Sequence, residues 1–285
     1  MDAQITIADL VAAKKDGRPI VAVSCYDYLT AKLVAQTDIH MILVGDSAAM
    51  VVLGHDSTLH ATMDYMVAIT AAVRRGAPKS FLVADMPFLS YQLGIKDAVR
   101  NAARFITEAG AQMVKIEVSQ ACLDVIKTVA DAGIAVMAHI GIRPQTVAKM
   151  GKLKAEGTTA EMALELMDLA QQAIHFGADA LLLEGAAAEV ADIITKQVDV
   201  PVISCGSGPA CDGQILIAPD ILGLGQGPLP KFAKKFGRVA EETIAALAEY
   251  ARQVHARQFP DSDHSYHMKK GEFERLQTLL GNMPR

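Results

Sequence analysis

Short apolar runs recur along the whole chain, and stretches with helical spacing lie between them. Each run is five or six residues long and rich in valine, isoleucine and leucine. Most are too uniformly apolar for strands that expose one face to water, so they are typical of parallel strands buried on both faces. The runs occupy residues 20–25, 41–46, 80–85, 113–117, 136–140, 180–185, 201–206 and, with a weaker pattern, 221–225.

Helical segments connect several of these runs. Residues 97–110 and 160–177 carry apolar side chains at helical spacing, and each segment ends on a glycine, which is common at helix C-termini. Eight strands that alternate with helices over about 250 residues predict a (β/α)8 barrel, also called a TIM barrel. The pattern leaves one alternative open, an open doubly wound parallel sheet.

The chain is long and apolar enough to form one large α/β domain. It has 285 residues, of which 51% are hydrophobic and 21% charged, and no low-complexity linker divides it. We therefore predict a single domain over residues 1–285, with the barrel at about 18–236. A lead helix at 6–15 is expected before the barrel, and a C-terminal helix at 237–257 begins a C-terminal segment and tail that reach residue 285.

Composition favours a small-molecule partner. The net charge is −5, the pI is about 5.9, and basic residues cluster only in short pairs, so no nucleic-acid partner is expected. No apolar run approaches the roughly 18 residues of a membrane span. The N-terminus lacks the basic-then-apolar order of a signal peptide, so we expect a cytoplasmic protein. The cysteines lack C-x-x-C spacing and are expected to be free thiols; they are Cys25, Cys122, Cys205 and Cys211.

Ionisable residues mark the carboxyl ends of successive apolar runs. Barrel enzymes carry their active sites at these ends, so we expect the side chains to meet at one mouth of the barrel. Lys115 precedes Glu117 by two residues, and strand alternation directs both to the same face. The residues at the strand ends are Asp46, Asp85, Lys115, Glu117, His139 and Glu184.

Carboxylates crowded at one rim favour a bound cation. They repel one another and raise each other's pKa unless positive charge is present. Oxygen donors without a histidine pair at i, i+4 spacing suit Mg²⁺, although another divalent ion stays open. Each residue alone also has a structural interpretation: a carboxylate after a strand is a common helix N-cap, and His139 would be a core histidine bonded to a backbone carbonyl.

Several motifs, in this order and at this spacing, resemble the ketopantoate hydroxymethyltransferases of the phosphoenolpyruvate mutase and isocitrate lyase superfamily. The similarity extends from about residue 4 to residue 268. The motifs are GDSAAMVVLGHDSTLHAT (45–62), AAVRRGAP (71–78), ADMPFLSY (84–91), AGAQMVKIE (109–117), HIGIRPQ (139–145), DGQIL (212–216), LPKFAKKF (229–236) and FPDSDHSYH (259–267).

The resemblance implies an enzyme of pantothenate biosynthesis with the (β/α)8 fold. Such an enzyme transfers a hydroxymethyl group from 5,10-methylenetetrahydrofolate to 3-methyl-2-oxobutanoate, which gives 2-dehydropantoate and tetrahydrofolate. The family uses Mg²⁺ and is typically decameric, so a homo-oligomer is expected here. The expected partners are therefore a small 2-oxo acid and folate.

The resemblance also assigns roles by motif position. The metal positions are Asp46, Asp85 and Glu117. The positions that hold the oxo acid are Asp46, Ser47, Asp85, Lys115 and His139. Glu184 corresponds to the catalytic base, which would remove the C3 proton while Mg²⁺ chelates the oxo acid and Lys115 adds a positive field.

Some positions depart from the family pattern. Ala48-Ala49 replace a usual Leu-Gly, Val118-Ser119 replace Gly-Gly, and the segments 183–187 and 204–213 lack a usual Val-Pro pair and a Gly-Ile-Gly-Ala-Gly run. Glycine losses restrict backbone angles, so we expect another shape for the loops after the second and fourth strands. No expected metal ligand or base is lost.

Two other functions stay open. One is a folate-independent lyase of the same superfamily, although no cysteine lies in the K-K-C-G-H type of motif expected of that branch. The other is a non-catalytic barrel that serves as an assembly or metal-binding scaffold. The presence of Glu184 beside a complete carboxylate set argues against a scaffold, which has no need of a base.

Overall fold

Eight parallel strands close into a barrel in the computed structural model, which describes residues 4–147, 151, 154–225 and 227–282. Each strand pairs with its neighbours in chain order, and β1 pairs with β8 to close the ring. This confirms the (β/α)8 prediction over the open sheet. The strands are β1 (Ile20–Ser24), β2 (Met41–Val44), β3 (Phe81–Asp85), β4 (Met113–Glu117), β5 (Ala135–Gly141), β6 (Ala180–Glu184), β7 (Val202–Cys205) and β8 (Gly213–Ile217).

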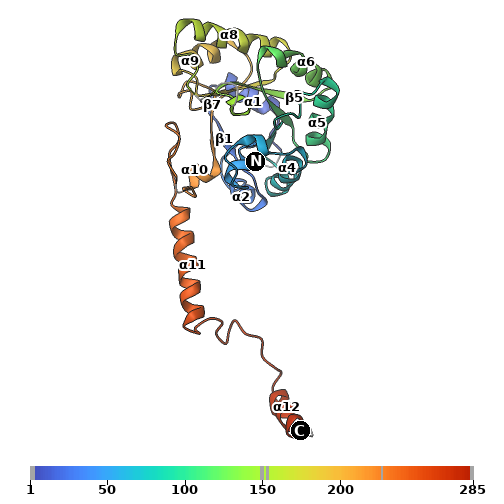
Figure 1. Ribbon diagram of the computed structural model, residues 1–285, viewed down its shortest axis with the longest axis vertical. Coiled ribbons are helices and arrows are strands. Elements are labelled where there is room, and N and C mark those ends of the chain that lie inside the picture. Colours follow the sequence, from blue (N-terminus) through green and yellow to red (C-terminus); the bar gives the residue numbers. More distant parts are fainter. Residues whose placement is uncertain (1–3, 148–150, 152–153, 226, 283–285) are drawn as a thin grey trace. The chain divides into compact units, whose positions relative to one another are not determined.

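Helices surround the strands, as Figure 1 shows for α2, α4, α5, α6, α8 and α9. Those predicted at 6–15, 97–110, 160–177 and 237–257 are confirmed within a few residues as α1, α5, α8 and α11. The helices are α1 (Ile7–Lys15), α2 (Tyr28–Val34), α3 (Ala48–Val51), α4 (Met63–Gly76), α5 (Ile95–Thr107), α6 (Leu123–Asp131), α8 (Ala160–His175), α9 (Ala188–Gln197), α10 (Ala218–Leu222), α11 (Val239–His255) and α12 (Glu272–Gly281).

The eighth strand lies earlier in the chain than the sequence pattern predicted. The run at 221–225 is not a strand, because its first residues end helix α10 and Gly223 follows as a left-handed C-cap with φ +69°. Pro219 lies in the first turn of α10, where its fixed φ suits a helix. The true β8 contains Gln214, which faces outward and interrupts the apolar run.

The strands divide the apolar core into an inner and an outer part. Inward-facing residues fill the barrel in stacked layers, and residues at alternate positions pack outward against the helices. Leu10 and Ala13 of α1 belong to the inner cluster. Lys14 of α1 ion-pairs with Asp212 at 2.7 Å just before β8. Helix α1 therefore packs at the N-terminal end of the barrel, opposite the polar carboxyl ends.

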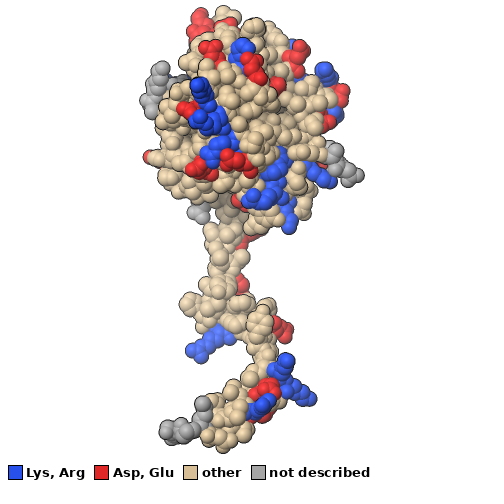
Figure 2. Space-filling model, turned by 90° about the vertical axis from the view of Figure 1, so that its right-hand side faces the viewer, with Lys and Arg blue, Asp and Glu red and all other residues tan. Residues whose placement is uncertain are grey.

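The chain divides into two compact units, Met1–Phe236 and Gly237–Arg285. The second unit contains α11 and α12, and the assignment of the whole chain to a single domain stays a prediction. Across the described residues, no helix combines the length and apolar character needed to cross a membrane. On the face of the barrel drawn in Figure 2, basic and acidic side chains are intermixed.

Gly141 allows β5 and β6 to approach closely beside the polar end of the barrel. It has φ +94° and is the register partner of Glu184, and an added Cβ would collide with the carbonyl oxygen of Glu184. Gly133 is a matched control, because it has φ +82° but open space around an added Cβ. We predict that Gly133→Ala lowers the free energy of unfolding by about 1–2 kcal/mol, the cost of left-handed backbone alone.

Gly141→Ala should lower the free energy of unfolding by at least about 3 kcal/mol, because a backbone clash adds to the same conformational cost. Urea denaturation of both variants measures the difference. Equal losses in the two variants would show that the close approach of β5 and β6 is not constrained as described.

Candidate active site

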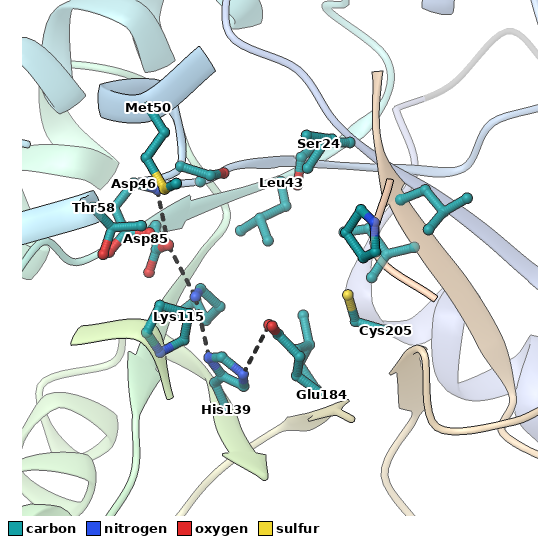
Figure 3. A pocket seen from close by; sticks show the side chains of 18 of the residues that line it. Ser24, Leu43, Asp46, Met50, Thr58, Asp85, Lys115, His139, Glu184 and Cys205 are labelled. Atoms are coloured by element: carbon teal, nitrogen blue, oxygen red, sulfur yellow. Dashed lines mark hydrogen bonds and ion pairs between the residues drawn. The ribbon is translucent and has the colours of Figure 1, made fainter. Parts of the chain in front are cut away.

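A cavity of about 300 Å³ lies at the carboxyl ends of the strands. Figure 3 shows its polar side chains, which converge from several strands and the loops that follow them. The structure brings every site residue expected from the sequence to this one cavity. These lining residues are Asp46, Ser47, Asp85, Lys115, Glu117, His139 and Glu184.

Strand alternation explains why these side chains meet. Four of the polar residues lie two positions after an inward-facing apolar residue, as Asp85 follows Val83 and Glu184 follows Leu182. The inner face of a strand is therefore apolar at depth and ionisable at its carboxyl end. Glu117 is the register partner of His139, so neighbouring strands also place their polar ends at the same height.

A buried ion pair lies at the centre of the site. Lys115 Nζ is 2.9 Å from Asp85 Oδ2, and both side chains are almost fully buried. The same carboxylate oxygen accepts a hydrogen bond from the backbone N–H of Asp46 at 3.0 Å. Burial opposes the charge on Lys115, but attraction by Asp85, Asp46 and Glu117 raises the pKa of the lysine above its usual value, so the ammonium group stays charged.

The histidine is neutral and its tautomer is fixed by Lys115. Burial and then the positive charge of Lys115 lower the pKa of His139. The ammonium group lies 3.3 Å from Nδ1 and can only donate, so Nδ1 accepts and the ring proton is on Nε2. Nε2 lies 3.4 Å from Glu184 Oε2 but without hydrogen-bond geometry. The imidazole thus presents an N–H towards Glu184.

Two buried carboxylate oxygens face the site without a hydrogen-bond partner among the described residues: Asp85 Oδ1 and Glu117 Oε1. Burial, opposed by Lys115 and reinforced by Asp46 and Asp85, raises the pKa of Glu117 to about 9. Burial and the charge of Asp46 likewise raise the pKa of Asp85, against the opposing attraction of Lys115. Unsatisfied oxygens and mutual repulsion are the properties of a carboxylate set suited to a cation.

The geometry of these carboxylates does not by itself form a metal cage. Within the described residues, no set of three His, Cys, Asp or Glu side chains is arranged so that it could hold a metal ion as it stands. Lys115 instead supplies the positive charge next to Asp85. The oxygen donors are nevertheless of the type that a hard divalent cation prefers, and the ligand roles of Asp46, Asp85 and Glu117 stay predictions.

The loop after β2 takes an ordinary right-handed conformation. Ala48 and Ala49 begin the short helix α3, and both are fully buried. Ser47 precedes them, and its hydroxyl lies 2.8 Å from the hydroxyl of Tyr26. Alanine is compatible with this backbone, so the structure needs no glycine at these positions.

The cavity has an apolar side opposite the charged cluster. Leu43 and Leu182 line it from β2 and β6, and Ile215 lines it from β8. Cys205 lies at the end of β7 beside Glu184, its register partner, and burial and then the charge of Glu184 raise the pKa of its thiol. The thiol is therefore protonated, and all four cysteines of the chain are free.

Gln145 is a site residue that the sequence reasoning missed. It is 2% exposed, and its side-chain Nε2 donates to Asp46 Oδ2 at 2.9 Å. The search of strand ends considered ionisable groups, whereas Gln145 is neutral and lies four residues after β5. The signal available was its place at the end of the motif HIGIRPQ (139–145), directly after a proline.

Sequence comparison connects this site with known proteins. The ketopantoate hydroxymethyltransferase family profile matches residues 4–262. The chain is 44% identical over 268 residues to a 3-methyl-2-oxobutanoate hydroxymethyltransferase from Geobacillus sp. (strain WCH70), a match that covers 94% of this chain and 96% of the relative. It is 41% identical over 267 residues to the enzyme of the same name from Bacillus thuringiensis (strain Al Hakam), with the same coverage.

Solved structures with low sequence identity share the fold. A phosphonopyruvate hydrolase complexed with oxalate and Mg²⁺ has a TM-score of 0.58 at 16% identity, over 96% of this chain and 97% of that chain. A 2,3-dimethylmalate lyase, a member of the phosphoenolpyruvate mutase/isocitrate lyase superfamily, has a TM-score of 0.56 at 16% identity, over 96% and 99%. The family profile and the close relatives establish that the chain belongs to the ketopantoate hydroxymethyltransferase family of enzymes.

Proposed function

We propose that this enzyme transfers a hydroxymethyl group from 5,10-methylenetetrahydrofolate to 3-methyl-2-oxobutanoate, which gives 2-dehydropantoate for pantothenate synthesis. The observation that carries the proposal is the division of one cavity into a charged side and an apolar side, with Glu184 between them. A branched 2-oxo acid has the same division, with an anionic oxo-acid end and an apolar alkyl end. The reacting C3 atom joins these two ends.

A divalent cation, Mg²⁺ by preference, completes the charged side in this proposal. Asp46, Asp85 and Glu117 would hold it, since their oxygens are hard donors and those of Asp85 and Glu117 include unsatisfied ones. When bound, the cation would withdraw electron density from the keto group of the substrate. The phosphonopyruvate hydrolase of similar fold was solved with Mg²⁺ and oxalate, a planar dicarboxylate that resembles the oxo-acid end.

The protein's own residues supply proton transfer and orientation. Glu184 is a partly exposed carboxylate of the cavity, with 21% of its side chain accessible, and acts as the base that accepts the C3 proton. The charged Lys115 stabilises the negative charge that develops on the keto oxygen. Ser47 and the N–H of His139 bind the anionic substrate, and Leu43, Leu182 and Ile215 contact its methyl groups.

The new C–C bond forms when the C3 carbanion attacks the one-carbon unit. That unit is at the oxidation level of formaldehyde, so the transfer needs no redox cofactor. The substrate loses its C3 proton to Glu184 and gains one carbon, while the two bonds between that carbon and the folate nitrogens break. The water oxygen keeps one proton and becomes the product hydroxyl, and the other water proton and the C3 proton end on the two nitrogens of tetrahydrofolate. An apolar wall beside the base limits competing protonation of the carbanion by water.

Removal of the C3 proton can be measured without the folate substrate. With Mg²⁺ and 3-methyl-2-oxobutanoate in D₂O, we predict loss of the C3 proton signal in NMR, and formation of dehydropantoate once methylenetetrahydrofolate is added. Glu184→Gln should retain substrate binding but slow the exchange by about 10²–10⁴-fold, because it removes the base. Chelation of the metal should slow exchange in the wild-type enzyme.

The outcomes separate the possible functions. Exchange without transfer would favour a folate-independent lyase, and neither reaction would favour a scaffold. Unchanged exchange in Glu184→Gln would remove Glu184 from the role of base. Cys122→Ser serves as a control, since Cys122 is absent from the cavity lining and the exchange rate should not change.

We further propose that the enzyme is a homo-oligomer, with a decamer expected from the family. In the first unit, the outward-facing residues Val21 and Gln214 of the β1 and β8 pair are exposed, whereas outward residues of other strands are buried. In the second unit, α11 carries an exposed apolar stripe at helical spacing: Ile244, Leu247, Tyr250 and Val254. Exposed apolar stripes of this kind mark protein contacts.

Light scattering coupled to gel filtration tests this proposal. The chain has a mass of 30.3 kDa, and we predict a particle several times heavier, with a decamer as the expected state. Leu247→Asp should lower the mass, because it puts a charge in the apolar stripe. Ala245→Asp adds the same charge on the other side of the helix and should leave the mass unchanged. A wild-type monomer would contradict the proposal.

A further inference from the structure

We propose that Gln145, oriented by Tyr91, is a positioning residue that holds Asp46 and Glu117 in the arrangement the active site requires. The inference rests on the proposed function, because it assigns these two carboxylates to a shared cation site. Neither residue of this Gln145–Tyr91 pair lines the cavity described above, and neither is ionised in it. Their effect would therefore act through the carboxylates they orient.

Gln145 contacts two of the proposed metal ligands through different groups. Its backbone N–H donates to Glu117 Oε2 at 3.1 Å, and its side-chain Nε2 donates to Asp46 Oδ2 at 2.9 Å. The backbone N–H is available because Gln145 lies in the 3₁₀ helix Pro144–Thr146, whose first N–H groups have no partner within the helix. Gln145, in the loop after β5, thus holds one carboxylate oxygen of Asp46, which follows β2, and one carboxylate oxygen of Glu117, which ends β4.

The side-chain amide has a single favourable orientation. Nε2 also donates to the carbonyl oxygen of Met86 at 3.0 Å, and a carbonyl can only accept. Rotation of the amide by 180° would place Oε1 against this carbonyl and against the Asp46 carboxylate, so two acceptor pairs would face each other in a buried site. Burial makes such unpaired acceptors costly.

Tyr91 maintains that orientation from the other side. Its hydroxyl is 2.7 Å from Gln145 Oε1 and 3.4 Å from the carbonyl oxygen of Glu117, and the tyrosine is 1% exposed. Burial and the nearby carboxylates raise the pKa of Tyr91 well above its usual value, so the hydroxyl remains a donor. The hydrogen-bond chain runs from Tyr91 through Gln145 to Asp46, and every donor and acceptor in it is defined.

The Gln145–Tyr91 pair thereby connects residues that lie at or just after the ends of β2, β3, β4 and β5. Met86 directly follows β3, and Asp46, Glu117 and Gln145 belong to or follow the other three strands. Asp46 and Glu117 each accept a hydrogen bond from Gln145 through one carboxylate oxygen. Oε1 of Glu117 has no hydrogen-bond partner among the described residues. Partners of this kind orient metal ligands, and their loss weakens metal affinity by about 10- to 100-fold.

The test measures divalent-cation affinity in the full-length protein without any reaction. Mn²⁺ serves as the probe, and its dissociation constant is read from the free-ion signal in electron paramagnetic resonance. We expect Gln145→Met, which keeps the length of the side chain but removes its donors, to raise the dissociation constant about 10- to 100-fold. Tyr91→Phe should also raise the dissociation constant, because without the tyrosine hydroxyl the side-chain amide of Gln145 is no longer held in a single orientation.

Tyr65→Phe is the matched control for Tyr91→Phe. The Tyr65 hydroxyl is buried and has no hydrogen-bond partner within the described residues, so its removal should leave the dissociation constant unchanged. Thermal unfolding of each variant, measured without metal, identifies the temperatures at which all variants remain folded. A purely structural role would lower the melting temperature yet leave Mn²⁺ affinity intact at those temperatures.

Wild-type affinity and the ratio of variant to wild type test different claims. Mn²⁺ binding by the wild-type protein tests the proposed metal site itself. A folded Gln145→Met variant with wild-type affinity would overturn the positioning role and leave the proposed function standing. Weakened binding in Gln145→Met and Tyr91→Phe, but not in Tyr65→Phe, is the result that the inference predicts.

Discussion

The ion pair between Lys115 and Asp85 is the interaction on which the rest of the site depends. It lies in a cavity lined by five carboxylates, from Asp46, Asp85, Glu117, Glu184 and Asp220, against one lysine ammonium group. A buried carboxylate is costly unless it is paired, so one cation inside this cluster leaves negative charge uncompensated. The remaining imbalance appears as the raised pKa of Glu117 and as carboxylate oxygens that have no hydrogen-bond partner in the described part of the chain. This imbalance supports the proposal that the site binds a cation together with an anionic substrate.

The barrel makes this arrangement possible because it fixes the cluster on rigid strands. Below the ionisable residues, inward-facing apolar side chains fill the interior, and α1 packs at the opposite end. The ionic groups therefore lie above a layer of packed apolar side chains. Little water reaches this layer, so electrostatic interactions there are strong. The same apolar layer lies next to the proposed base, so the charged and alkyl ends of the proposed substrate would meet two different environments. The proposed chemistry follows from this division.

Much of the fold and most of the site were predictable because strand alternation is a local property. The residues that end β3 and β6 share an inner face with the apolar residues two positions earlier, and Glu117 at the end of β4 shares one with Lys115. Asp85, Glu117 and Glu184 could therefore be assigned to the mouth of the barrel from the sequence alone. The eighth strand was predicted wrongly, because Gln214 interrupts its apolar pattern and the more uniform run at 221–225 belongs to the end of α10.

Gln145 could not be found in the same way. Its proposed role lies in contacts with residues 99 and 59 positions away in the chain, Asp46 and Met86, which depend on how the loops after β2, β3 and β5 fold at the barrel mouth. A neutral amide gives no charge pattern, and the orientation of its side chain is set by Tyr91 on another loop. Local sequence patterns predict strands and the residues at their ends. These contacts form only when the barrel is assembled, so no local pattern predicts them.

Calorimetric titration of 3-methyl-2-oxobutanoate with and without Mg²⁺ tests most directly the claim that the buried carboxylate cluster is a cation-dependent site for an oxo acid. The account predicts measurable binding in the presence of Mg²⁺ and a loss of affinity of at least about tenfold, or 1.4 kcal/mol, when the metal is chelated. The uncompensated carboxylates would then repel the anionic ligand. Equal affinity with and without the metal would contradict the account, because the cluster would then bind the anion without the cation that its charge requires.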